Sequence, residues 1–157
     1  MLTAQNIYEL CFNFLNERRL IAEDQTTFYR RMLVTDNVYS HVDMDDLAAV
    51  IRTNPLLQYV DRLHEEINDC DDYALQLKAA MAALYRHRAY SAGQTVYPPA
   101  VAIIITEYHA LNLIVVNHEG EYQVYIVDTM MSQPAITQDP TEAWLLMKQG
   151  SVTNVYI

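Results

Sequence analysis

Apolar residues recur with a helical period through the first half of the chain. From residue 3 to residue 18 they fall three or four positions apart, and Thr3 stands before them as a suitable N-cap. This pattern predicts a first helix whose buried face contains Ile7, Leu10, Cys11, Phe14 and Leu15. A second helix is predicted over residues 22–34, with Phe28, Met32 and Leu33 turned inward.

Capping residues mark three further helix starts. Asp43 can cap a short helix over residues 44–52, and Asn54 followed by Pro55 is typical of the start of another. The helix expected after Asp69 has the most regular pattern, because its apolar residues repeat at intervals of three and four along one face. That face contains Cys70, Ala74, Leu77, Met81 and Leu84.

Beyond Pro99 the helical period gives way to short runs of β-branched and apolar residues. Between the second and third runs, "NHEGE" is typical of a hairpin turn, with Gly120 available for a positive φ. A short helix is expected in "DPTEAWLLMKQG", with Gly150 past its end, and strands are expected at 100–106, 109–116, 122–128 and 151–157. The predicted fold class is therefore α+β, with a helical N-terminal part packed on an antiparallel sheet of about four strands.

The composition is that of a single globular domain covering residues 1–157. Hydrophobic residues make up 52% of the chain, and it contains only three glycines and five prolines, so it can bury a core. Within this domain, residues 1–67 are expected to form a helical subregion. Residues 68–157 are expected to contain the helix that begins near Cys70 and the antiparallel sheet.

The net charge of −10 narrows the range of partners. A nucleic-acid interface needs a basic surface, and anionic membranes attract basic segments, so we expect neither partner. The longest apolar runs are shorter than the ~20 residues of a membrane helix, and the N-terminal stretch does not have the pattern of a signal peptide. Two cysteines form no disulfide framework, so a cytoplasmic protein in a reducing compartment is expected.

Cys70 is a candidate nucleophile because of its place at a predicted helix start. In "NDCDDYALQL", Asp69 is a good N-cap, so Cys70 falls at about the first helical position. The free backbone N–H groups and the positive end of the helix dipole stabilise a thiolate there, and the same N–H groups can hold an oxyanion. Cys11, in contrast, lies on the apolar stripe of the first helix and is interpreted as a core residue.

His109 is the histidine best placed to act as a base, because it begins an apolar strand. If Glu119 and Gly120 form the centre of the hairpin turn, Asn117 pairs with Tyr122. In that register His109 and Asp128 are diagonal neighbours on the same face, within reach of each other. Asp128 can then fix the tautomer of His109 and stabilise its charged form, as the third member of a triad does.

The residues "DCDDYA", "HALNLIVV" and "YIVDTM", in this order, resemble the papain-like and transglutaminase-like cysteine hydrolases. The spacing is most similar to small bacterial and phage peptidases of the transglutaminase-like type, and to the cysteine-protease domain of certain fungal lectins. The resemblance covers about residues 68–130 and leaves the helical first third unexplained. It implies a cysteine at a helix start, followed by a histidine and an acidic residue or an asparagine on successive antiparallel strands.

The resemblance also implies a role for each residue. Cys70 would be the nucleophile, His109 the general acid and base, and Asp128 the orienting group. Papain-like enzymes have a glutamine about six residues before the cysteine that helps to form the oxyanion hole, and here that position is His64. Asn68 is the alternative auxiliary residue. The implied function is a thiol-dependent hydrolase or acyl transferase acting on an amide bond of a protein or peptide, by hydrolysis, deamidation or transfer.

Three aspartates around the cysteine keep other interpretations open. Their charges disfavour a thiolate, so Cys70 can also be read as an inert residue at a capped helix start. The chain would then be a catalytically inactive binding or accessory protein on the same scaffold. The acidic runs at 69–72 and 43–46 offer oxygen ligands for calcium, although neither has the EF-hand pattern, and a calcium-stabilised module is the remaining alternative. No other metal or cofactor is expected.

Overall fold

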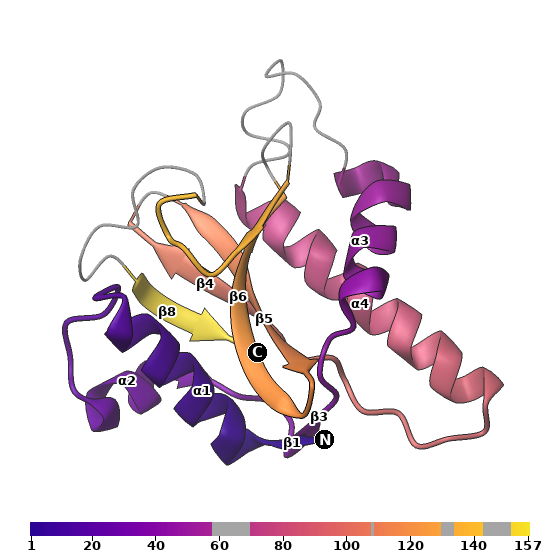
Figure 1. Cartoon of the computed structure of the whole chain (residues 1–157), viewed down its shortest axis with the longest axis horizontal. Coiled ribbons are helices and arrows are strands. Elements are labelled where there is room, and N and C mark those ends of the chain that lie inside the picture. The colour runs from indigo at the N-terminus through magenta and orange to yellow at the C-terminus, as the bar shows by residue number, and fades with distance from the viewer. Residues whose placement is uncertain (58–69, 108, 130–133, 143–151) are drawn as a thin grey trace.

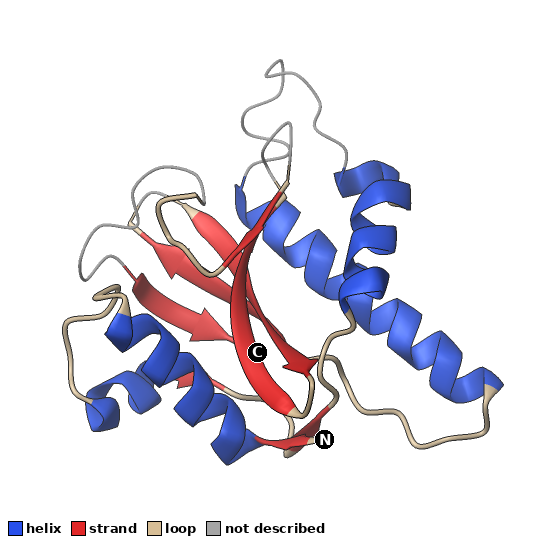
Figure 2. Cartoon of the chain, viewed as in Figure 1, coloured by secondary structure: helices blue, strands red, loops and turns tan. Residues whose placement is uncertain are grey.

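A six-stranded mixed sheet runs through the middle of the computed structural model, with helices on both of its faces (Figures 1 and 2). The structure describes residues 1–57, 70–107, 109–129, 134–142 and 152–157. The strand order in the sheet is β2-β8-β4-β5-β6-β7, and β1 and β3 form a separate two-stranded sheet. The strands are β1 (Leu2–Thr3), β2 (Met32–Leu33), β3 (Val38–Tyr39), β4 (Val101–Thr106), β5 (Ala110–His118), β6 (Glu121–Asp128), β7 (Ala135–Thr137) and β8 (Val152–Tyr156).

The helices begin where the sequence supplies a capping side chain. Thr3 caps α1 through a hydrogen bond that its hydroxyl accepts from the Asn6 amide, and Asp43 caps α3 in the same way. Both predicted caps are confirmed. The helical elements are α1 (Ala4–Glu17), α2 (Gln25–Arg31), α3 (Met44–Thr53), the 3-10 turn η1 (Pro55–Leu57) and α4 (Cys70–Ser91). Within the described ranges, no helix has the length and apolar character needed to span a bilayer.

The α+β class is confirmed, but a sheet of about four antiparallel strands is not, because the observed sheet is mixed and has six strands. The four predicted strands are present as β4, β5, β6 and β8, and each neighbouring pair among them is antiparallel. Two short strands extend the sheet beyond them: β2 pairs in parallel with β8, and β7 pairs with β6. Strands of two or three residues are too short to produce a periodic pattern, so the sequence alone did not indicate them.

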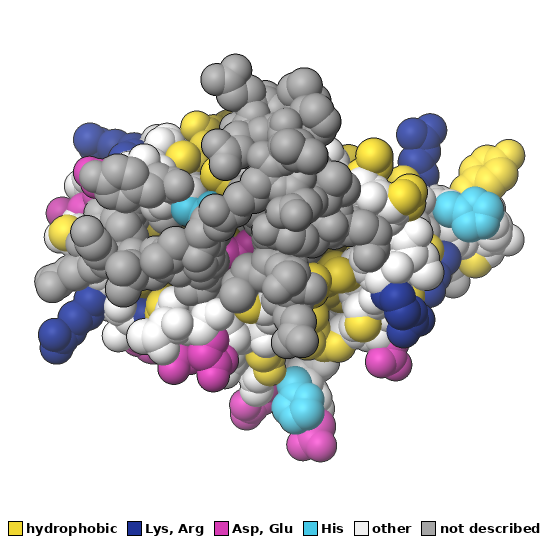
Figure 3. Space-filling model, turned by 90° about the horizontal axis from the view of Figure 1, so that it is seen from above, with side chains coloured by type: hydrophobic (Ala, Val, Ile, Leu, Met, Phe, Trp, Pro, Cys, Tyr) yellow, Lys and Arg dark blue, Asp and Glu magenta, His cyan; other side chains and the backbone are white. Residues whose placement is uncertain are grey.

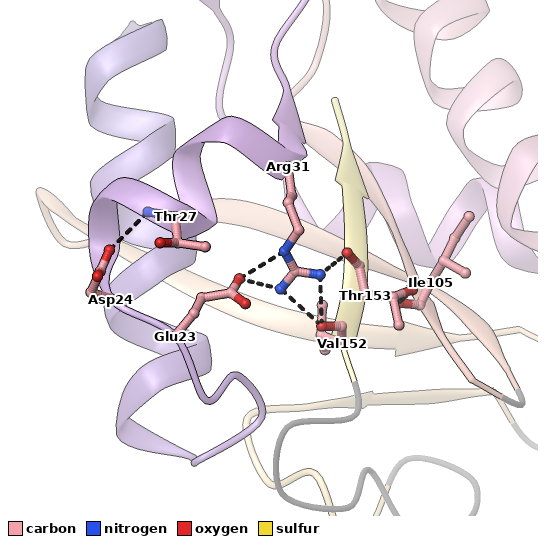
Figure 4. Close-up of polar contacts among 7 residues, drawn as sticks. All are labelled: Glu23, Asp24, Thr27, Arg31, Ile105, Val152 and Thr153. Carbon is pink, nitrogen blue, oxygen red and sulfur yellow. Dashed lines mark hydrogen bonds and ion pairs between the residues drawn. The ribbon is translucent and has the colours of Figure 1, made fainter.

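The second predicted helix is shorter than expected at both ends. Asp24 caps α2, which ends at Arg31, and the next two residues pair with Val155 and Tyr156 as β2. Figure 4 shows what holds α2 to β8: the Arg31 guanidinium bonds to Glu23 and donates to the carbonyl oxygens of Val152 and Thr153. Helix α2 thus ends where β8 is available to form strand hydrogen bonds with the next two residues.

Each face of the sheet is buried under its own helices (Figure 1). On one face α1 and α2 contribute Ile7, Cys11, Phe14, Leu15 and Phe28 to the core; on the other, α3 and α4 contribute Leu47, Ile51, Tyr73, Leu77 and Met81. Seven consecutive residues of β5, from Ala110 to Val116, are buried. Because both faces of the strand are covered, it is a continuous apolar run instead of an alternating one.

The hairpin between β5 and β6 has the predicted turn and register. Glu119 and Gly120 have φ values of 53° and 95°, as a tight two-residue turn of this kind requires, and the Gly120 amide donates to the Asn117 side chain at 2.9 Å. Asn117 pairs with Tyr122, as predicted. The register continues without a shift along the hairpin, so it fixes the position of the last residue of β6, Asp128, relative to the start of β5.

Candidate active site

Helix α4 carries Cys70 as its first residue. The cysteine is partly buried, while Tyr73, Ala74, Leu77 and Met81 behind it are buried against the sheet. These residues include most of the predicted apolar face and fix the helix in place. Because the first turn of a helix has backbone N–H groups without intrahelical partners, the thiol lies where a negative charge is favoured.

His109 directly precedes β5, at a short connection between β4 and β5. Thr106 holds its backbone: the Thr106 amide donates to the His109 carbonyl at 2.8 Å, and the Thr106 hydroxyl accepts from the His109 amide at 2.9 Å. Thr106 was not among the residues predicted from the sequence. A threonine three residues before a histidine, with only residues 107–109 between two apolar strands, is the signal that would have indicated it.

The imidazole of His109 contacts the carboxylate of Asp128 from the neighbouring strand β6. The distance from Nε2 to Oδ2 is 2.9 Å, and the two side chains are only 11% and 2% exposed. This contact confirms the proximity predicted from the hairpin register. A buried carboxylate is stable only with a close partner, and here the partner is a ring that can carry a positive charge.

The pKa of His109 is raised by this environment. Burial works to lower it, but hydrogen bonds to Asp128 and to Cys70, with the charges of both groups, outweigh burial and raise the pKa from 6.5 to about 9. The ring therefore carries a proton at neutral pH. The structure thus brings together all three predicted residues: the imidazole of His109 interacts with Asp128 and with Cys70.

The remaining cysteine and histidines of the described segments lie in other environments. Cys11 is 1% exposed in the core, and burial raises the pKa of its thiol to about 12, which confirms that it is a core residue and leaves it unreactive in the native state. His41, His87 and His118 are exposed, whereas His109 is partly buried. The predicted auxiliary residue Asn68, together with His64 and Asp69, lies outside the described residues.

The carboxylates considered as calcium ligands at positions 43–46 have other partners. Asp43 accepts hydrogen bonds from the amides of Asp45 and Asp46 as a helix cap, and Asp46 forms an ion pair with Arg88. Among the residues that the structure describes, no group of three or more histidine, cysteine or acidic side chains is arranged to hold a metal ion. A calcium site stays an untested alternative.

The comparisons with known proteins give a similar fold and no family. No protein-family model and no curated protein matches this chain. A solved structure named "PSL1a-E64 complex" superposes with a TM-score of 0.65 at 17% sequence identity. The match covers 99% of this chain and 49% of that one, so the chain spans about half the length of its structural neighbour. At this identity the likeness shows a common fold alone.

Proposed function

We propose that this chain is a thiol-dependent hydrolase or acyl transferase that acts on amide bonds through Cys70, His109 and Asp128. The observation that carries the proposal is the His109 ring, which interacts with Asp128 through Nε2 and also with the thiol at the start of α4. A nucleophile, a base and a group that orients the base are the parts that acyl transfer needs. The resemblance to papain-like and transglutaminase-like hydrolases supports the same assignment.

The protonated state of His109 defines the first step. With a pKa of about 9, the imidazole holds a proton at neutral pH. In the proposed mechanism, Cys70 reacts as the thiolate beside this charged ring. The thiolate attacks the amide carbonyl carbon to form a tetrahedral intermediate, whose oxyanion the backbone N–H groups at the start of α4 stabilise. His109 then donates its proton to the leaving nitrogen, so the C–N bond breaks and a thioester forms on Cys70.

The second half of the reaction returns the enzyme to its starting state. Water or an amine attacks the thioester carbonyl, and His109 accepts a proton from that attacking water or amine. The Cys70 sulfur then leaves as the thiolate. Asp128 interacts with Nε2 throughout, so Nδ1 is the ring nitrogen left for the thiol and the substrate. Water gives hydrolysis or deamidation, and an amine gives transfer.

The proposed substrate is a protein or peptide, and the proposed compartment is the reducing cytoplasm, where a catalytic thiol stays reduced. The structural neighbour's name describes a complex with E64, which makes E64 a useful probe for the present chain. We expect E64 to form an adduct with Cys70 and none with Cys11, because the latter is buried in the core.

A peptide library tests the reaction itself. The wild-type chain is incubated with a mixture of peptides and an amine, and mass spectrometry separates cleavage, deamidation and amine transfer by their different mass changes. We expect one of these products from the wild type and from Cys11→Ala, and none from Cys70→Ala. Products that persist in Cys70→Ala would contradict Cys70 as the nucleophile. No product together with no E64 adduct would contradict the proposal and favour an inactive binding protein.

A further inference from the structure

Asn112 is a polar side chain inside the apolar layer between α4 and the sheet. It belongs to β5, is 1% exposed, and its Nδ2 donates to the carbonyl oxygens of Ala74 at 2.9 Å and Ala102 at 3.1 Å. Its Oδ1 is buried and has no hydrogen-bond partner among the residues that the structure describes. One amide therefore joins three elements, α4, β4 and β5.

The stability of the fold does not explain this side chain. A neutral hydrogen bond adds little net free energy to folding, and a buried acceptor without a partner costs a comparable amount. An aliphatic residue at this position would extend the apolar surface of β5 without that cost. Stability therefore does not account for an asparagine at position 112.

The three elements that Asn112 joins are those that build the candidate site. Ala74 lies one helical turn after Cys70 in α4, and His109 lies three residues before Asn112 at the start of β5. Ala102 belongs to β4, whose last residue is the Thr106 that holds the His109 backbone. Apolar side chains permit a helix to slide along a sheet. The bond to Ala102 holds the Asn112 amide within the sheet, and the bond to Ala74 then ties α4 to one position on it.

We propose that Asn112 is a positioning residue that sets the docking of α4 on the sheet, so that the Cys70 thiol lies against the His109 imidazole. This inference rests on the proposed function, because it assigns a purpose to the contact between those two groups. The hydrogen bonds of Asn112 go to backbone carbonyls and not to the thiol or the ring, so Asn112 acts through the backbone of α4.

The test compares Asn112→Val with a control variant on the same strand. Ile114→Val changes a fully buried neighbour on the same face of β5 and leaves the amide in place. Two quantities are measured in each variant: the melting temperature, and the rate of iodoacetamide alkylation of Cys70 from pH 5 to 9 by site-resolved mass spectrometry. Asn112→Ala is measured in parallel in case the valine does not fit.

We expect Asn112→Val to melt close to the wild type but to lose alkylation rate at pH 7 by roughly tenfold to a hundredfold, the scale on which small displacements of reacting groups act. Its rate should rise only at higher pH. Ile114→Val should melt at a lower temperature and keep the wild-type profile. A purely structural asparagine would give the opposite result, with stability lost and the pH profile unchanged.

Three outcomes would overturn the proposal. If Asn112→Val or Asn112→Ala folds and keeps the wild-type profile, the positioning role is wrong while the proposed function stands. If neither variant folds, Asn112 is a structural residue. If wild-type Cys70 itself reacts like an ordinary thiol, regardless of His109, the proposed function fails and the positioning role fails with it.

Discussion

At the scale of single residues, His109 is the group whose protonation links the site to the stability of the fold. Its pKa is raised from 6.5 to about 9, so the folded state binds the proton more tightly than the unfolded state does. The resulting stabilisation is complete below pH 6.5 and is lost as the pH rises through 9.

This predicts a specific pH dependence of stability. Between pH 6.5 and 9, the free energy of unfolding of the wild type should fall, and His109→Gln should lose much of that slope, because glutamine does not titrate. Urea denaturation at several pH values measures both chains. A wild-type curve as flat as that of His109→Gln over this window would contradict the raised pKa of His109.

The residues of the site differ in how far the sequence could predict them. The pair His109 and Asp128 was predictable because a local feature, the turn at Gly120, sets the hairpin register. Thr106 was within reach of the same local reasoning. The contacts of Asn112 were not, because its partners Ala74 and Ala102 meet it only after α4 has docked on the sheet.

At the scale of elements, the contact between α2 and β8 depends on Arg31. Replacing it with alanine leaves Glu23 without its ion-pair partner and removes the hydrogen bonds to the carbonyl oxygens of Val152 and Thr153. We expect Arg31→Ala to lower the free energy of unfolding by about 1–3 kcal/mol.

Arg30 supplies the matched control for this prediction, because it is exposed on the same helix. Arg30→Ala should change stability by no more than ~0.5 kcal/mol. Equal effects of the two substitutions in chemical denaturation would show that the guanidinium of Arg31 does not hold α2 to the sheet. The rate of Cys70 alkylation should be unchanged in both variants, since the contact between α2 and β8 does not involve the residues of the site.

The pairing of β2 with β8 explains why the sheet was only partly predictable from the sequence. Helix caps and long apolar strands are encoded within a few neighbouring residues, and Thr3, Asp43 and the four long strands were identified from them. Met32 and Leu33 continue the apolar pattern of a helix, but they form β2 because β8, from the far end of the chain, offers a parallel edge. Local sequence carries no information about that edge.

At the scale of the whole molecule, the N-terminal third is an integral part of the fold, because it packs on the sheet and adds residues to the core. Residues 1–67 were expected to be helical, but within the described part they also supply β1, β2 and β3, and α1 buries Ile7 and Phe14 on one face of the sheet. A fragment of residues 34–157 would expose that face to water. We therefore expect the fragment to lack cooperative thermal unfolding.

Circular dichroism of the fragment and of the full chain, measured side by side, checks this expectation. A cooperative melt of the fragment would show that residues 34–157 fold alone.

That the protein does not bind nucleic acid stays a prediction. On the described part of the face in Figure 3, basic side chains lie toward the two ends, and acidic side chains lie beside and between them. A net charge of −10 adds to the repulsion of phosphate groups.

The measurement that tests the central claim most directly is the pH profile of Cys70 alkylation by iodoacetamide in the native wild type, His109→Ala and Asp128→Asn. We predict fast labelling of Cys70 near neutral pH, no labelling of Cys11, and the loss of the fast reaction in His109→Ala, with a smaller loss in Asp128→Asn. A slow reaction of Cys70 that rises only at alkaline pH, with the same profile in all three chains, would contradict the proposed site.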